Sequence, residues 1–230
     1  MRTFGTSEFL FLLAALRWTV LLTLIAFAVG IVGGLLLAVA RTSPLRWLRW
    51  IAAAYIQLFQ GTPVLMQLFV VYYGLAVLFG LKIEAWPAVV IAFTLYASAF
   101  LGEIWRGFIQ ALPAGQWMAA RSLALPWHLQ LALIILPQAL RQSIPATVGF
   151  LVQLIKSTSV ASIIGFVELT RAGQLMTNVT FQPLVVYPVV ALLYFLICWP
   201  LSMIGLRLER KRTDQAKGNS RPLAPLVTGT

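Results

Sequence analysis

Long apolar segments without charged side chains dominate this sequence. The clearest runs from Trp18 to Ala40, 23 residues without Lys, Arg, Asp or Glu. A helix needs about 20 such residues to cross the hydrocarbon core of a bilayer, because each residue advances about 1.5 Å. Only 10% of the chain is charged, against about 25% in an average soluble domain. The sequence therefore predicts a polytopic membrane protein and excludes a small soluble enzyme.

Five segments are predicted to cross the membrane, which makes the fold class an all-α membrane protein with five transmembrane helices. The predicted spans are Trp18–Ala40, Pro63–Leu81, Trp86–Ile109, Ile144–Ile164 and Leu184–Leu206. Glycines in the first span favour close helix packing. Thr62 and Pro63 are interpreted as the N-cap and first-turn proline of the second. Polar residues interrupt the fourth span, so two half-helices are an alternative there.

The ends of the chain are expected to lie outside this bundle. Residues 1–17 would form an N-terminal interfacial segment, with Phe9–Leu16 as a short helix on the outer face. Residues 18–208 would form the transmembrane domain. Residues 209–230 would form a polar, disordered cytoplasmic tail. Arg41–Trp50 alternates basic residues with tryptophan and is expected to lie on the inner leaflet as a helix.

The distribution of basic residues predicts the orientation. Cytoplasmic loops are enriched in Lys and Arg. With the C-terminus inside, 12 of the 17 basic residues are cytoplasmic and 5 are outside. We therefore expect the N-terminus outside and the C-terminus in the cytoplasm. The net charge of +11 is explained by these loops and by lipid contact, so no nucleic-acid partner is expected.

Residues for catalysis are scarce. The chain has one histidine, His128, and one cysteine, Cys198, too few for a metal cluster. It lacks the G-x-x-x-x-G-K-[ST] phosphate loop, so ATP binding by that route is excluded and no cofactor is expected. An intramembrane protease could use His128, but no Gly-x-Ser-x-Gly elbow precedes a helix. A non-enzymatic role is favoured.

The loop between the third and fourth spans contains a predicted short cytoplasmic helix, Gln116–Leu125. Good helix formers fill it and Pro126 would end it. Ala119 and Ala120 would give it a smooth side that a groove or second helix could approach. The alternative is an amphipathic connector that lies on the membrane surface.

Several motifs in this chain resemble those of permease subunits of bacterial ABC importers. Met118-Ala119-Ala120-x3-Ala124-x9-Ile134-x-Leu136-Pro137 has the spacing of the family pattern E-A-A-x3-G-x9-I-x-L-P. The polar amino acid type (histidine, glutamine, glutamate) is indicated by further motifs: Gln60-Gly61-Thr62-Pro63, the stretch from Gly102 to Gln116, Ile135 to Arg141, and Lys156 to Gly165. The resemblance covers about Trp18 to Leu208.

Four positions depart from the family pattern. Met118 replaces the signature glutamate, Ala124 its glycine, Gln60 an arginine, and Ser157 an aspartate. The first change removes a polar contact at the coupling loop, and the last removes a cation ligand. A paired, non-identical permease could supply the missing groups.

The resemblance implies a specific assembly. Two permease subunits would form the pathway, two cytoplasmic ATPase subunits would each receive one coupling helix, and a periplasmic binding protein would deliver the amino acid. The coupling residues implied by the family pattern are Gln116, Met118, Ala119, Ala120, Arg121 and Ala124.

Polar side chains deep in the fourth span are candidates for the substrate pathway. They are Gln153, Lys156, Ser157, Thr158 and Ser159. An ionisable group facing lipid costs about 2.5–3.5 kcal/mol on insertion scales, which makes Lys156 a functional candidate. Alternatively, Lys156 extends to the outer surface and the hydroxyls bond neighbouring helices. Glu103 and Arg106 are predicted to form an internal ion pair.

An ion-driven secondary transporter is the alternative function. Such a transporter typically contains an internal inverted repeat, and none is evident in this sequence. The motif series favours the ATP-driven importer.

Overall fold

The computed structural model describes residues 4–80 and 83–219, and every regular element in those ranges is a helix. In chain order these are α1 (Thr6–Thr42), α2 (Arg46–Gly61), α3 (Val64–Phe69), η1 (Val70–Gly74), α4 (Leu75–Phe79), α5 (Ala85–Ala111), α6 (Ala114–Ser122), α7 (Trp127–Leu129), η2 (Gln130–Ile135), α8 (Leu136–Ser157), η3 (Thr158–Ile164), α9 (Leu169–Thr180) and α10 (Pro183–Asn219). The predicted all-α class is confirmed.

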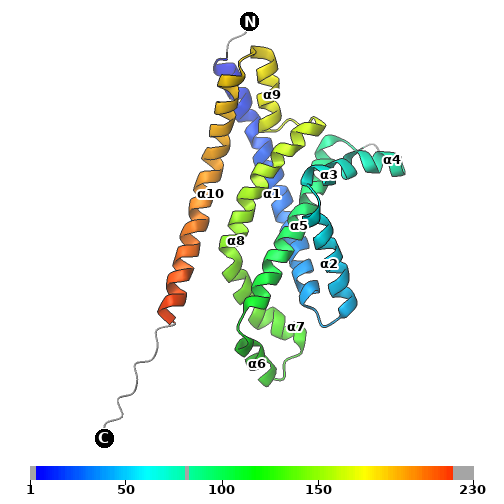
Figure 1. The fold of residues 1–230 in the computed structure, drawn as a ribbon, viewed down its shortest axis with the longest axis vertical. Helices are drawn as coiled ribbons and strands as arrows, with labels where there is room; N and C mark the ends of the chain where they lie inside the picture. The colour runs from blue at the N-terminus through cyan, green and yellow to red at the C-terminus, as the bar shows by residue number, and fades with distance from the viewer. Residues whose placement is uncertain (1–3, 81–82, 220–230) are drawn as a thin grey trace.

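Four helical runs are long and apolar enough to cross a membrane: Thr6–Thr42, Ala85–Ala111, Trp127–Ile164 and Pro183–Arg212. They follow the long axis of the molecule, with α9 near the end where α1 begins and α6 and α7 at the other (Figure 1). A fifth span exists only if α2 and the helices after it count as one, across a bend of 106°. The predicted number of five therefore corresponds to four continuous spans and one broken segment.

The second span is not the predicted helix Pro63–Leu81. Instead, α2 runs beside α1, and the segment from α3 to α4 turns away from the bundle (Figure 1). Pro63 lacks an N–H and disfavours helical geometry at the residue before it. Thr62 is accordingly extended, and its hydroxyl donates to the carbonyl of Leu58 at 2.7 Å. The Thr62-Pro63 pair ends one helix as well as preceding the next.

Helix boundaries elsewhere also differ from those predicted. α1 is continuous across residue 17, so the structure has no separate short helix at Phe9–Leu16. The predicted interfacial helix Arg41–Trp50 is divided between the end of α1 and the start of α2. α10 extends the last span to Asn219, so the disorder predicted from residue 209 is wrong up to that point. The tail from residue 220 lies outside the described residues.

Small residues allow α1 and α5 to lie in close contact. This confirms the close packing predicted from the glycines of the first span. A Cβ at Gly30 would lie 2.7 Å from the Cβ of Ala97, and one at Gly34 would lie 2.8 Å from the Cβ of Leu101. Without water to drive apolar association, helices in lipid are held by such close packing. The α1–α5 pair is thus the centre of the bundle.

Gly34→Ala is expected to lower the free energy of unfolding by about 1–3 kcal/mol, because the new methyl group overpacks the α1–α5 contact. The Cβ would also approach the backbone nitrogen of Gly102 to 3.1 Å, so backbone must move. Gly149→Ala in α8 is the matched control, since its Cβ would meet no described heavy atom within 4 Å. Thermal unfolding in detergent measures both variants. Equal shifts would contradict the packing assignment.

A buried polar network joins α1, α9 and α10 at the end opposite α6. Glu168 is fully buried and caps α9, where its carboxylate accepts hydrogen bonds from the backbone N–H groups of Thr170 and Arg171, both at 2.8 Å. The hydroxyl of Tyr194 on α10 donates to the same carboxylate at 2.9 Å. From α1, Thr19 accepts the backbone N–H of Leu169 at 3.1 Å. Burial raises the pKa of Glu168, although its hydrogen bonds act in the opposite direction.

Candidate functional site

α6 projects from one end of the bundle, beyond the ends of α1 and α5 (Figure 1). Pro113 precedes it in an extended conformation, so the helix starts at Ala114. It ends at Ser122, because Ala124 has a positive φ of 52°. That left-handed geometry costs about 1–2 kcal/mol for a residue with a Cβ. The predicted helix Gln116–Leu125 is therefore shifted toward the N-terminus, and the turn at Ala124 rather than Pro126 ends it.

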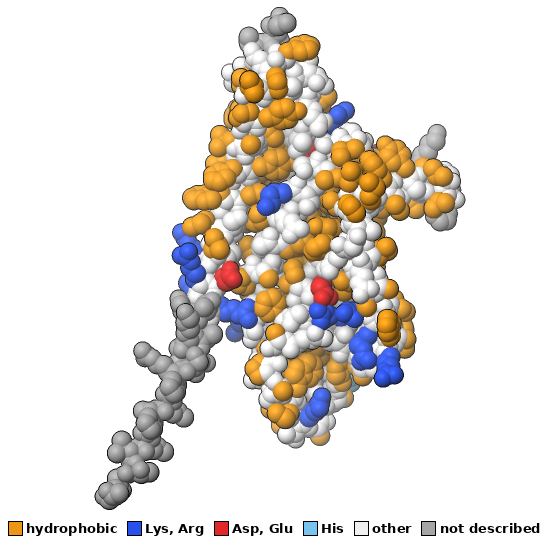
Figure 2. Space-filling model, in the orientation of Figure 1, with side chains coloured by type: hydrophobic (Ala, Val, Ile, Leu, Met, Phe, Trp, Pro, Cys, Tyr) orange, Lys and Arg blue, Asp and Glu red, His pale blue; other side chains and the backbone are white. Residues whose placement is uncertain are grey.

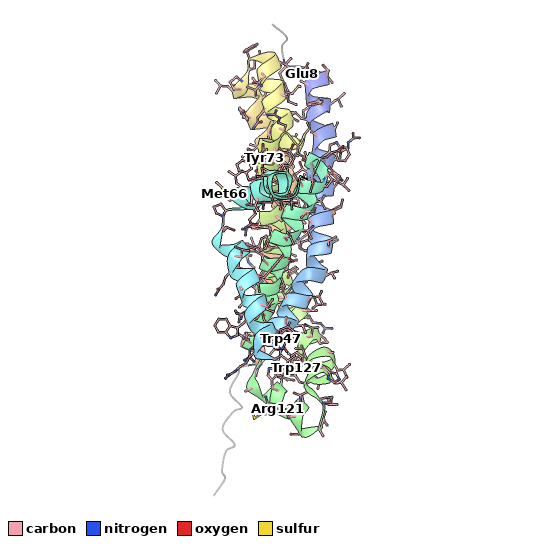
Figure 3. The ribbon with its side chains drawn as sticks, turned by 90° about the vertical axis from the view of Figure 1, so that its right-hand side faces the viewer. Glu8, Trp47, Met66, Tyr73, Arg121 and Trp127 are labelled. Atoms are coloured by element: carbon pink, nitrogen blue, oxygen red, sulfur yellow. The ribbon has the colours of Figure 1, made fainter. Side chains whose placement is uncertain are left out.

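Burial divides the predicted coupling residues into two groups. Ala120 is fully buried, and α6 packs against η2. The remaining predicted coupling residues are exposed: Gln116, Met118, Ala119, Arg121 and Ala124. Arg121 lies near the tip of the molecule (Figure 3). Of the two alanines predicted to form a smooth side, only Ala119 is therefore available to a partner. A charge at Ala120 would disturb folding rather than docking.

The exposed surface of α6 and of the residues that follow it is largely apolar. Met118 is 61% exposed and Leu123 is 68% exposed, on either side of Ala119 and Arg121. Such side chains at the tip of a membrane protein, away from the apolar spans, favour contact with another protein. This surface, residues 116–124 without Ala120, is called the α6 surface below.

Hydrogen bonds connect α6 and the loop after it to the run Trp127–Ile164. Gln130 of η2 donates through Nε2 to the carbonyl oxygen of Leu125 at 2.6 Å. Gln138 of α8 donates to Oε1 of Gln116 at 3.3 Å and to the carbonyl of Ile134 at 2.7 Å. Since η2 continues directly into α8, these bonds connect α6 to the whole run Trp127–Ile164.

The predicted ion pair between Glu103 and Arg106 is confirmed. Nε of Arg106 donates to Glu103 at 2.8 Å, and the guanidinium also donates to Gln110 one turn further along α5. The pair lies near the end of α5 that leads into α6. It neutralises one arginine at this end of the bundle.

The five predicted pathway residues do not share one environment. Thr158 is fully buried and its hydroxyl donates to the carbonyl of Ile155 at 2.7 Å. The hydroxyl of Ser159 donates to the carbonyl of Lys156 at 2.7 Å, and Ser157 is half-buried. These hydroxyls lie where α8 tightens into the 3₁₀ segment η3. Thr158 and Ser159 are thus used by the local backbone.

Gln153 and Lys156 are exposed and lie on one face of α8 with Gly149. Residues spaced by three and four share a helix face, so these three form a stripe. The stripe presents an amide, an ammonium group and, at Gly149, bare backbone. The exposed surfaces of the other spanning helices instead present large apolar side chains. It is the best-supported part of the predicted pathway set.

Tyr96 of α5 belongs beside this stripe, although the sequence analysis did not identify it. Its hydroxyl accepts a hydrogen bond from Nε2 of Gln153 at 3.2 Å, and the side chain is 6% exposed. A phenol inside an apolar span is a detectable signal, because its hydroxyl needs a partner when buried. Its partner could not be identified without the pairing of α5 and α8.

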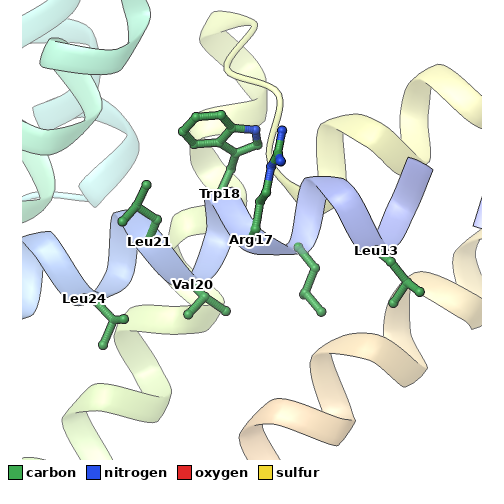
Figure 4. A pocket seen from close by; sticks show the side chains of 7 residues that line it. Leu13, Arg17, Trp18, Val20, Leu21 and Leu24 are labelled. Atoms are coloured by element: carbon green, nitrogen blue, oxygen red, sulfur yellow. The ribbon is translucent and has the colours of Figure 1, made fainter. Parts of the chain in front are cut away.

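A groove of about 790 Å³ lies elsewhere, along α1. Its walls are mainly leucine and valine, with Arg17 and Trp18 side by side at one point (Figure 4). The guanidinium of Arg17 stacks on the Trp18 ring at 5.2 Å from the centroid. An apolar groove on a spanning helix is what lipid chains would cover, so it does not define the site.

Comparisons with known proteins identify the family. A model described as "Binding-protein-dependent transport system inner membrane component" matches residues 30–214. The L-cystine transport system permease protein TcyB of Bacillus subtilis is 38% identical over 195 residues, which is 84% of this chain and 83% of that protein. A putative glutamine transport system permease protein of Rickettsia conorii is 35% identical, covering 82% and 87%.

A solved structure agrees with these relatives. A crystal structure titled as an amino acid ABC transporter with histidines has a TM-score of 0.80 and 33% identity, with 87% of this chain and 94% of that chain covered. The range that the family model matches contains α6 and three of the four runs, Ala85–Ala111, Trp127–Ile164 and Pro183–Arg212, together with the end of the first. The chain therefore belongs to the inner-membrane components of binding-protein-dependent transport systems, the permease subunits of ABC importers.

Proposed function

We propose that this permease carries a polar amino acid across the bacterial inner membrane, with energy from ATP hydrolysed by a separate subunit. The observation that carries the proposal is the α6 surface, a short exposed helix that Gln138 bonds to the run Trp127–Ile164, with Gln130 bonding the loop after it at Leu125. Its relatives are named for cystine and glutamine transport, which supports an amino acid as the substrate class.

The family implies the kinds of partner proposed here. A cytoplasmic ATPase subunit receives the α6 surface in a groove, a second permease subunit completes the pathway, and a periplasmic binding protein delivers the substrate at the α9 end. Basic side chains on the visible face concentrate toward the α6 end (Figure 2), which supports a cytoplasmic position for it. The N-terminus is then periplasmic and the C-terminus cytoplasmic.

In the proposed mechanism, the run Trp127–Ile164 moves as a rigid element and transmits a displacement of α6. When the ATPase subunits close on ATP, they displace α6, and the hydrogen bonds of Gln130 and Gln138 pass that displacement to η2 and α8. The stripe of Gln153 and Lys156 moves with α8 and changes the side from which the pathway is open. Rocking of rigid elements about an interface is a common form of such switching.

Uptake in proteoliposomes tests the function. The complete transporter is expected to accumulate a radiolabelled polar amino acid when ATP is enclosed with the ATPase side, and to do so after the proton gradient is collapsed. Uptake that follows the ion gradient and continues without ATP would instead establish the secondary transporter. Glutamine and cystine are the first substrates to test, with the binding protein present.

Gln153→Ala and Lys156→Ala are expected to lower the uptake rate about tenfold each, because both remove polar groups from the α8 stripe. A tenfold change corresponds to about 1.4 kcal/mol, within the range of one hydrogen bond to a charged group. Ile144→Ala, an exposed position of α8 away from the stripe, is the control and should leave uptake unchanged. Wild-type rate and affinity in both variants would remove the stripe from the pathway.

A further inference from the structure

A polar cavity of about 410 Å³ lies where α1, α2, α5 and α6 meet. Six residues line it: Arg41, Thr42, Arg49, Ile109, Gln110 and Trp117. Two of these six are arginines and none is acidic. The cavity is distinct from the α8 stripe and from the exposed part of the α6 surface. Its lining is positively charged.

The hydrogen bonds around the cavity leave several donors unused. Arg49 uses one N–H on the carbonyl of Ser43 at 3.0 Å. Among the described residues, no hydrogen bond or ion pair engages Arg41, and its Nε is buried without a partner. Gln110 receives Arg106 on its amide oxygen, which leaves the amide NH₂ to donate. Guanidinium groups donate but do not accept, and the lining offers the two arginines no acidic partner.

The neighbouring surface places the cavity at the level of lipid headgroups. Trp47 and Trp50, in the first turns of α2, are 60% and 75% exposed. Trp47 lies above Arg121 and Trp127, between the spanning part of the bundle and its α6 tip (Figure 3). Exposed tryptophans concentrate at the boundary between hydrocarbon and water. This position favours a ligand from the membrane surface over an acidic segment of a protein partner.

We propose that this cavity is an oxyanion site that binds a phosphate group, presented by an anionic phospholipid headgroup or by free phosphate. The planar guanidinium fork binds phosphate oxygens in pairs, and two such forks line the cavity. A bound phosphate accepts from Arg41 and Arg49 and supplies the missing negative charge. Because Trp117 belongs to α6, the ligand also touches the coupling element. That last consequence depends on the proposed function, whereas binding itself does not.

Native mass spectrometry of the purified complete transporter tests the site. The transporter is incubated with phosphatidylglycerol or with phosphatidylcholine, and the retained lipid is counted. Arg41→Gln is expected to weaken phosphatidylglycerol binding about tenfold, because it removes a charged hydrogen-bond donor to the phosphate. Arg46→Gln removes the same charge from an exposed neighbouring position outside the cavity and should stay near wild type. Arg41→Lys keeps the charge and should restore part of the affinity.

Millimolar inorganic phosphate distinguishes the two sources. Displacement of phosphatidylglycerol by phosphate in the wild type indicates that the free ion also occupies the site, whereas resistance indicates a lipid headgroup. Equal losses in Arg41→Gln and Arg46→Gln would overturn the proposal in favour of diffuse surface charge. Unchanged lipid binding with loss of an associated ATPase chain would overturn it in favour of a protein contact. These readouts do not depend on transport, so the proposed function can fail separately.

Discussion

Ala119→Glu is expected to reduce ATP-driven uptake at least about tenfold while the protein still folds and reaches the membrane. Ala119 is exposed on the α6 surface between Met118 and the buried Ala120. Docking would desolvate the new carboxylate, and a buried charge left without a compensating partner costs about 3–5 kcal/mol. The measurement is uptake per transporter in proteoliposomes, with ATP hydrolysis recorded in parallel.

Two comparisons make this result specific. Ala111→Glu places the same charge on an exposed position at the end of α5, outside the α6 surface, and should transport normally. Ala120→Glu should instead lower expression and thermal stability, because that side chain is fully buried. Full uptake by Ala119→Glu at wild-type membrane levels would show that the α6 surface does not dock.

Glu168→Ala is expected to destabilise the protein by about 2–4 kcal/mol. The change removes the cap of α9, formed by the backbone N–H groups of Thr170 and Arg171 and typically worth about 1 kcal/mol. It also removes the carboxylate that accepts from the buried hydroxyl of Tyr194, which costs about 1–3 kcal/mol. The thermal unfolding midpoint of the detergent-solubilised protein measures the loss.

Glu84 provides the matched control for this change. It occupies the N-cap position of α5 but makes no capping hydrogen bond through its side chain, and it is exposed. Glu84→Ala should therefore change stability by less than about 0.5 kcal/mol, as surface substitutions usually do. Similar shifts in the two variants would show that the Glu168 network does not hold α1, α9 and α10 together.

Composition predicts a span correctly where no residue near its ends also favours a different structure. The third predicted span, Trp86–Ile109, differs from α5 by only one residue at its start and two at its end. The prediction of the second span is wrong because a proline such as Pro63 is compatible with two structures: it can begin a helix or end the one before it. The sequence shows the proline, but the choice depends on how α2 packs beside α1 and α5.

The sequence predicts the candidate site only in part, for a similar reason. Motif spacing locates α6 to within two or three residues, but which of Ala119 and Ala120 faces outward depends on contact with η2. The end of the helix depends on the φ of Ala124, a position where glycine would adopt the same geometry at lower cost. The Tyr96–Gln153 and Glu168–Tyr194 hydrogen bonds were missed because the two partners of each bond are distant in sequence.

Site-specific crosslinking tests the central claim, that the α6 surface contacts the ATPase, most directly. A cysteine replaces Ala119 in a Cys198→Ala background, is labelled with a photoactivatable maleimide, and is irradiated in the natural complex. A second variant places the cysteine at Val179 on α9, at the opposite end. The account predicts a crosslink from position 119, and not from position 179, to a nucleotide-hydrolysing chain. Efficient labelling at 119 without such a crosslink would contradict it.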